Sequence, residues 1–449
     1  MTADPEELQG ETIELLQQMI RNACVNEGTE LSGGESRNAD DLVSYLEGSG
    51  ADIERFEPVP GRASIVARLE GSDPSSAPSL LYLAHTDVVP VNPDAWQRDP
   101  FGGELVEGEV WGRGAVDMLN LTSSMAVGFK RIADSGFRPR GNLTYVGVAD
   151  EEALGTHGAG WLVDNAIDAV RADYVITESG GIPMDTPAGI RLPVMVAEKG
   201  CYWCKLTVHG TAGHASAPLR TDNAVVTAAE VIRRIAAFQP PAVIGEAWRR
   251  LVEGLALPDA ISRQLLDPER IGALLDVMPD LGLARQAHAS THTTISPTIA
   301  HGGTKTNVIP DTAEIELDIR ILPGQVGADI RAMLEEVLGD LGDRVDITTI
   351  VEEEASESPI DTPLWDVLSR VSTRYHEGSA TIPILAVGAT DARFFRRVGA
   401  TAYGYGMFSK KMSFEHYVSM FHGANERVDV ESLGLSASLF ETVAREFLG

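Results

Sequence analysis

The chain of 449 residues is longer than one ordinary hydrophobic core requires, so its length predicts two domains. Hydrophobic residues make up 43% and charged residues 23%, as in a typical globular protein, and no apolar run of 18 residues predicts a transmembrane helix. The 36 basic and 66 acidic residues give a net charge of −30, which argues against nucleic acid or an anionic membrane as a partner.

The N-terminal segment MTADPEELQGE (1–11) is acidic and lacks the basic and apolar regions of a signal peptide. The cysteines Cys24, Cys201 and Cys204 are too few for a disulfide framework. Cys201 and Cys204 form a Cys-x-x-Cys pair, but on an alternating strand they point to opposite faces, which favours packing over a redox or zinc motif. We therefore expect a cytoplasmic protein.

Residues 1–197 alternate short apolar runs with helical patterns. Apolar spacing predicts helices at 13–20 and 118–136, and strands are expected in the runs ASIVARLE (63–70), SLLYLA (79–84), NLTYVGV (142–148) and ADYVIT (172–177). Short apolar runs separated by helices are typical of buried, mostly parallel strands that are covered on both faces. This region is therefore expected to form an α/β domain with a mostly parallel central sheet.

The pattern changes over residues 198–356. Apolar and polar side chains alternate in YWCKLTVHG (202–210), as in a half-exposed strand of an antiparallel sheet. Further helices and strands complete an α+β domain, with a mostly helical insertion at about 239–293. The buried α/β pattern resumes over 357–449. We therefore expect a catalytic α/β domain, formed by 1–197 and 357–449, which the α+β domain interrupts.

Polar residues follow three of the predicted buried strands. SLLYLA ends at His85, NLTYVGV leads to Glu151 and Glu152, and ADYVIT leads to Glu178. Each feature alone has an ordinary explanation, such as a surface His-x-Asp pair or a solvated Glu-Glu turn. Because ligands of open α/β sheets bind beyond the carboxyl ends of the strands, the four side chains are expected in one crevice. A divalent metal would offset their charge, and zinc accepts both imidazole and carboxylate ligands.

Six motifs follow one another along the chain: HTDVVP (85–90), WGRGAVDM (111–118), DEEALG (150–155), TESGG (177–181), GTAGHASAP (210–218) and HGANE (422–426). Together they resemble the M20 metallopeptidase family, which includes aminoacylases, carboxypeptidases of the glutamate and yeast S types, and succinyl-diaminopimelate desuccinylase. The resemblance spans roughly residues 10–445. It implies a zinc-peptidase-like catalytic domain that is interrupted by a lid and dimerisation domain, and a homodimer.

The resemblance assigns metal ligands residue by residue. His85, Asp117 and Glu178 would hold one zinc ion, and Asp117, Glu152 and His422 would hold the other, so that Asp117 bridges the two. Cobalt or manganese are possible substitutes for zinc.

Three further residues receive catalytic roles from the resemblance. Asp87 would accept a hydrogen bond from the second ring nitrogen of His85, and Glu151 would be the general base for a metal-bound water. His214, in the lid, would stabilise the oxyanion and often acts on the other subunit of a dimer. The alternative for His214 is a turn histidine that caps a helix.

Three residues are candidates for substrate binding. Asn307 and Arg320 occupy lid positions that contact substrate in the family, and Arg393 could bind a substrate carboxylate from the catalytic domain. The alternative for Arg320 is an ion pair with Asp318 or Glu316 on the same strand face. The alternative for Arg393 is an exposed position on a helix surface.

The expected activity is cleavage of an amide bond next to a free carboxylate, either deacylation of an N-acyl amino acid or release of the C-terminal residue of a short peptide. Glu178 resembles the deacylase and carboxypeptidase branch, because aspartate accompanies aminopeptidases and dipeptidases at this position. The helical insertion resembles the carboxypeptidase S-like branch. The enzymatic alternative is an aminopeptidase or dipeptidase. The non-enzymatic alternative is a metal-bound regulatory or binding protein without turnover.

Overall fold

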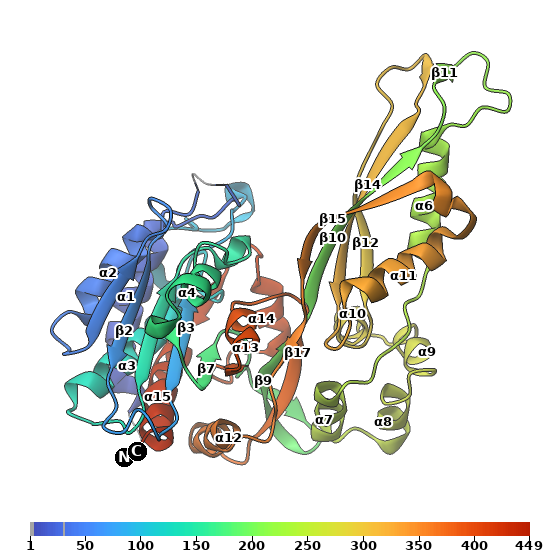
Figure 1. Ribbon diagram of the computed structural model, residues 1–449. Coiled ribbons are helices and arrows are strands. Elements are labelled where there is room, and N and C mark those ends of the chain that lie inside the picture. The colour runs from blue at the N-terminus through green and yellow to red at the C-terminus, as the bar shows by residue number, and fades with distance from the viewer. Residues whose placement is uncertain (1–3, 30–31) are drawn as a thin grey trace.

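The computed structural model describes residues 4–29 and 32–449 (Figure 1). A body built from both ends of the chain carries an elongated arm built from its middle. No helix among the described residues has the length and apolar character needed to cross a membrane.

The body contains a ten-stranded sheet with the order β1-β2-β6-β3-β7-β18-β9-β16, and β8 and β17 also pair with β9. Its strands are β1 (Asp52–Phe56), β2 (Ser64–Leu69), β3 (Leu80–His85), β6 (Leu143–Val148), β7 (Tyr174–Thr177), β8 (Met184–Thr186), β9 (Gly189–Glu198), β16 (Ser356–Glu357), β17 (Ala380–Ala386) and β18 (Thr401–Gly404). The central strands β6, β3, β7 and β18 are parallel, and antiparallel strands flank them. The predicted α/β class with a mainly parallel central sheet is confirmed.

Helices cover both faces of this sheet. Alternate residues of β3 belong to different cores: Tyr82 packs with one set of helices, and Leu81 and Leu83 pack with the other. The first set is α1 (Pro5–Asn22), α2 (Ser36–Leu46), α3 (Leu119–Asp134), α12 (Pro363–Tyr375) and α15 (Val430–Phe447). The second is α4 (Ala159–Asn165), α5 (Ile167–Val170) and α13 (Ala392–Arg397). Burial on both faces explains why the central strands are almost entirely apolar.

Short elements complete the body near the carboxyl ends of the central strands. They are β4 (Glu104–Val106), β5 (Glu109–Trp111) and β19 (Arg427–Asp429), which form a small sheet, α14 (Phe414–Met420), and the 3-10 turns η1 (Pro93–Ala95) and η2 (Glu151–Ala153).

The arm is built on a four-stranded antiparallel sheet with the order β12-β14-β10-β15. Its elements are β10 (Gly200–His209), β11 (Gly213–His214), α6 (Ala224–Ala237), β12 (Thr294–Gly302), β13 (Val308–Ile309), β14 (Thr312–Ile321), α11 (Gly327–Leu338), η3 (Gly339–Arg344) and β15 (Val345–Glu353). Tyr202, Cys204, Leu206 and Val208 pack under α6 and α11, on the single face that the alternating sequence predicts. The arm is therefore a one-sided α+β sheet, and β11 and β13 pair at its tip (Figure 1).

Residues 239–293 contain four short helices: α7 (Glu246–Leu255), α8 (Asp259–Leu265), α9 (Ile271–Leu275) and α10 (Leu281–Thr291). They form a small core of their own around Trp248 and Val252. Helix α7 packs against β17 and β9, so this part of the insertion lies against the large sheet.

Candidate metal centre

Side chains from three strand ends and two loops meet at the carboxyl edge of the large sheet. His85 ends β3, Glu151 and Glu152 follow β6, and Glu178 follows β7. His85 Nε2 lies 3.2 Å from Asp117 Oδ1 and 3.8 Å from Glu178 Oε2. Parallel strands explain the convergence, because all their carboxyl ends lie at the same edge.

His422 reaches the same cluster from the loop after α14. Its Nε2 lies 3.1 Å from Asp117 Oδ2 and 3.2 Å from Glu152 Oε2. The two oxygens of Asp117 therefore face the two histidines, His85 on one side and His422 on the other. All six residues expected to form the metal site and its base thus lie together.

The backbone is left-handed at three of these turns. Asp150 has a φ of 73°, Ser179 a φ of 71° and His422 a φ of 55°. Such values are uncommon for residues other than glycine and gather at functional sites, where the surrounding structure holds them. Here each value lies at or beside a residue of the cluster, so a bend in the chain directs the side chain toward the centre.

Asp87 is placed differently from the sequence expectation. The backbone carbonyl of Asp87 lies 3.0 Å from His85 Nδ1, whereas its carboxylate Oδ1 is 3.6 Å away, beyond hydrogen-bond range. The carboxylate instead accepts hydrogen bonds from the backbone N–H groups of Glu151 and Glu152, at 3.2 and 3.1 Å. Asp87 therefore orients both ends of the cluster, His85 through its main chain and the two glutamates through its side chain.

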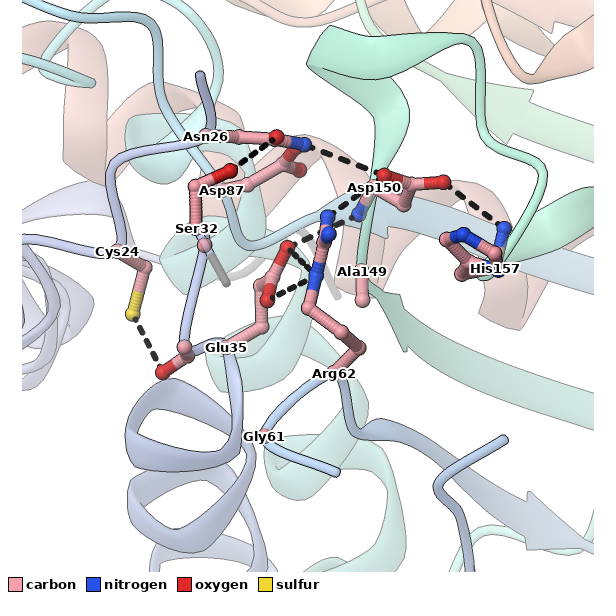
Figure 2. Close-up of polar contacts among 12 residues, drawn as sticks. Cys24, Asn26, Ser32, Glu35, Gly61, Arg62, Asp87, Ala149, Asp150 and His157 are labelled. Atoms are coloured by element: carbon pink, nitrogen blue, oxygen red, sulfur yellow. Dashed lines mark hydrogen bonds and ion pairs between the residues drawn. The ribbon is translucent and has the colours of Figure 1, made fainter. Parts of the chain in front are cut away.

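A buried polar network supports Asp87 and the turn after β6 (Figure 2). Arg62 donates to Glu35 at 2.8 Å and to Asp150 at 2.6 Å, and all three side chains are at most 2% exposed. Asn26 bridges Asp87 Oδ2 at 2.8 Å and Asp150 Oδ1 at 3.3 Å. Sequence reasoning missed this network, because Arg62, Glu35 and Asn26 stand in segments without a recognisable motif.

Glu426 was also missed as a site residue, although it ends the motif HGANE. It is fully buried and accepts hydrogen bonds from the N–H groups of Val116 and Asp117, at 2.6 and 2.9 Å, and from Arg113 Nη1 at 2.7 Å. These bonds fix the loop that carries Asp117. The sequence did contain a signal for Glu426, namely its position four residues after His422 in the same motif.

The electrostatics of the cluster call for positive charge at its centre. Burial, followed by repulsion from Glu178, raises the pKa of Glu151 well above its usual range, and burial and Asp117 raise the pKa of Glu152 to about 7. Burial alone would lower the pKa of His85, but the adjacent carboxylates raise it overall. A cation at the centre would keep these crowded carboxyl groups ionised.

The donor set fits a metal ion. Imidazole and carboxylate atoms lie within 4.8 Å of one another in two groups, His85 with Asp117 and Glu152, and His85 with Glu151 and Glu178. Oε1 of Glu152 is buried and has no hydrogen-bond partner among residues 4–29 and 32–449. A buried acceptor without a donor is unfavourable unless a cation or water satisfies it.

The two candidate arginines already have partners within the chain. Arg320 makes a two-pronged ion pair with Asp318, at 2.8 and 3.0 Å. An ion pair of this kind is the alternative to substrate binding that the sequence predicted for Arg320. Arg393 is buried, not exposed on a helix surface, and donates to the carbonyls of Thr390 and Leu154, both at 2.7 Å. The Leu154 contact ties α13 to the turn that carries Glu151.

His214 and Asn307 lie together at the tip of the arm and apart from the metal cluster (Figure 1). The N–H of Ala215 donates to the Asn307 carbonyl at 3.1 Å. The N–H of Ser216 donates to His214 Nδ1 at 3.2 Å, so Nδ1 is an acceptor and the neutral ring carries its proton on Nε2. His214 therefore presents an N–H donor to its surroundings.

A two-part fold with a buried histidine–carboxylate cluster at the edge of a parallel sheet defines a metal-dependent hydrolase. The match of residues 81–446 to the model of Peptidase family M20/M25/M40 places the chain in that family. The family match agrees with the motifs from HTDVVP to HGANE.

Named relatives cover most of the chain. N-fatty-acyl-amino acid synthase/hydrolase PM20D1 of Xenopus tropicalis is 28% identical over 393 residues, which are 85% of this chain and 74% of that protein. Aminoacylase-1 of Mus musculus is 25% identical over 436 residues, 95% of this chain and 92% of that protein. The crystal structure of the M20 family metallo-carboxypeptidase Sso-CP2 from Sulfolobus solfataricus shares the fold, with a TM-score of 0.71, 19% identity, and coverage of 97% of this chain and 99% of the other.

Proposed function

We propose that the protein is a dizinc amidohydrolase that cleaves an amide bond next to a free carboxylate, as in an N-acyl amino acid or at the C-terminus of a short peptide. The observation that carries the proposal is the position of Asp117, whose two oxygens face His85 and His422. One ligand set, completed by Glu178, would hold the first ion, and another, completed by Glu152, would hold the second. The names of the aminoacylase and acyl-amino acid hydrolase relatives support this substrate class.

The protein's own residues supply the proton transfers. Bound zinc would lower the pKa of a water molecule and polarise the amide carbonyl. Glu151, which is grouped with His85 and Glu178, can take a proton from water and return it to the leaving nitrogen. Because Asp87 holds the adjacent main chain, Glu151 can act as the base while Glu152 remains a ligand.

The oxyanion donor is proposed to be His214 Nε2, supplied by a second copy of the chain. Within one chain His214 lies at the arm tip, on the far side of the arm from the body (Figure 1). Exposed apolar side chains on α6 and the edge strand β12, namely Val225, Val226 and Ile299, give a surface that a homodimer would cover. The protein is proposed to work in the cytoplasm, consistent with its three free, buried cysteines.

Substrate carboxylate binding is proposed for Arg320, with Asn307 of the lid as a further contact. Arg320 is partly exposed and would exchange Asp318 for the substrate, since guanidinium binds carboxylates in the same two-pronged way. Arg393 is the second candidate for this carboxylate. Its bonds to Thr390 and Leu154 would have to rearrange first.

A hydrolysis panel tests the proposal. The zinc-loaded protein is offered N-acyl amino acids, their C-terminal amides, and dipeptides with a free or a blocked amino group. We expect turnover of the free acids with blocked amines and weak turnover of the amides. A requirement for a free amine would instead identify an aminopeptidase or dipeptidase, and no turnover with zinc bound would identify a binding or regulatory protein.

A further inference from the structure

An apolar cavity of about 510 Å³ lies between the helical insertion and the large sheet, outside the metal cluster. One wall is formed by α7, α8 and α10, through residues such as Leu251, Leu265 and Ala287. The other is formed by β9 and β17, through Ala197, Ile384 and Leu385. A volume of this size falls within the roughly 300–1,000 Å³ range of small-molecule sites.

The chemistry of the walls selects an aliphatic ligand. Most lining side chains are aliphatic, and Val243, Ile261 and Leu283 remain 38–49% exposed along it. The charged residues that line it are acidic, Asp185, Glu246 and Glu357, and none of its lining residues in the described part of the chain is a lysine, arginine or histidine. An anionic head group would therefore be repelled, whereas an uncharged hydrocarbon chain would be favoured.

The cavity walls connect along the chain to the metal centre. β8, which contributes Met184, follows the proposed ligand Glu178, and α14, which begins at the lining residue Phe414, leads to His422. From Glu178 to Met184 the chain spans at most about 20 Å. A long acyl chain with its amide at the cluster can cover such a distance.

We propose that this cavity binds a linear aliphatic chain, the tail of a fatty-acyl substrate whose amide lies at the metal centre. The assignment of the tail to the substrate rests on the proposed amidohydrolase function. The cavity's affinity for hydrocarbon does not rest on it. A free long-chain molecule offers the same chemistry, so the two sources are separated experimentally.

Direct binding is measured first, with metal-free protein and two dansyl probes that carry either a decyl or a methyl chain. Each buried methylene is expected to raise affinity by a factor of about four, so the decyl probe should bind at least 100-fold more tightly. Ala287→Phe fills the cavity from α10 and should weaken decyl binding at least tenfold. Ala289→Phe places the same side chain on the same helix away from the cavity and should leave it unchanged.

Two results would overturn the cavity assignment: equal binding of the decyl and methyl probes, or unchanged decyl binding in Ala287→Phe. If that variant does not fold, Ser290→Phe fills the same cavity from a less buried position. Neither outcome depends on catalysis, so both are distinct from failure of the proposed function.

Hydrolysis then identifies the source of the chain. For N-acyl amino acids with one amino acid and increasing acyl length, kcat/KM should rise with length in the wild type. Ala287→Phe should lower kcat/KM at least tenfold for the palmitoyl substrate and leave the acetyl substrate unchanged. If probe binding is lost but palmitoyl turnover is kept, the cavity holds a separate aliphatic ligand, and the assignment to the substrate tail is overturned.

Discussion

Glu151 and Glu152 are neighbours in the chain but face different groups. Glu152 Oε2 lies 3.2 Å from His422, whereas Glu151 is grouped with His85 and Glu178. We predict that Glu151→Gln keeps both metals and lowers kcat by roughly 10²–10⁴, the typical effect of losing a general base. Glu152→Gln should weaken one metal site. Metal analysis beside steady-state kinetics checks both variants, and equal metal loss in the two would contradict the division of roles.

Arg62 is the cation on which the turn after β6 depends. Arg62→Met would leave Glu35 and Asp150 buried without their charge partner, so we expect the free energy of unfolding to fall by about 3–5 kcal/mol. The matched control is Arg55→Met, whose ion pair with Asp40 is partly exposed and should contribute at most about 1 kcal/mol. Chemical denaturation compares the variants, and similar losses would show that the buried network is not structurally important.

At the scale of single residues, the sequence predicted the site residues that belong to recognisable motifs. It did not predict the buried residues that hold them in place. His85, Glu151 and Glu178 could be predicted because each stands at or just after the end of a buried strand. Arg62 and Glu35 could not, since 27 residues separate them from each other and 88 separate Arg62 from Asp150. Their pairing depends on tertiary contacts that no local pattern records.

At the scale of elements, β9 passes directly into β10, and Lys199 stands between them. It is 1% exposed and donates to the carbonyl of His292 at 2.8 Å. Burial, with a contribution from Arg320, lowers the pKa of Lys199 to about 7. The junction between body and arm therefore contains a lysine that loses its charge near neutral pH.

This shift predicts a pH dependence of stability. Between pH 7 and the usual lysine pKa near 10.5, the unfolded state binds a proton that the folded state does not, so stability rises with pH. From pH 7 to 9.5 we expect the wild type to gain about 2–3 kcal/mol relative to Lys199→Met. Denaturant titrations of both proteins at the two pH values measure this difference, and parallel pH profiles would mean that Lys199 titrates normally.

Most elements could be predicted from periodicity, but their packing could not. The alternating pattern of β10 identified a one-sided sheet, and the apolar run of β3 identified a strand buried on both faces. The edge strand β12 carries Pro297 and is largely exposed, so it lacks an apolar signal. The insertion was recognisable as helical, but the contact of α7 with β17 joins segments more than 100 residues apart.

At the scale of the whole molecule, the arm separates His214 from the metal cluster of its own chain (Figure 1). The sequence placed His214 in the lid but did not indicate how far the arm carries it. If His214 acts on a second copy, mixing His214→Ala with Glu151→Gln subunits should restore part of the activity, because one site in each hybrid dimer is intact. Recovery upon mixing, followed with subunit exchange, measures this. A fully active monomer would rule the arrangement out.

The central claim is that two metal ions held by Asp117 and its neighbours are required for amide hydrolysis. Stepwise addition of zinc to the metal-free protein, with bound metal and hydrolysis of an N-acyl amino acid measured at each step, tests it most directly. We expect the metal-free protein to remain folded, since a core of this size does not need metal to form. We expect activity to reach its maximum as bound zinc approaches two ions per chain. Full turnover in the metal-free protein, or maximal turnover with no zinc bound at these residues, would contradict it.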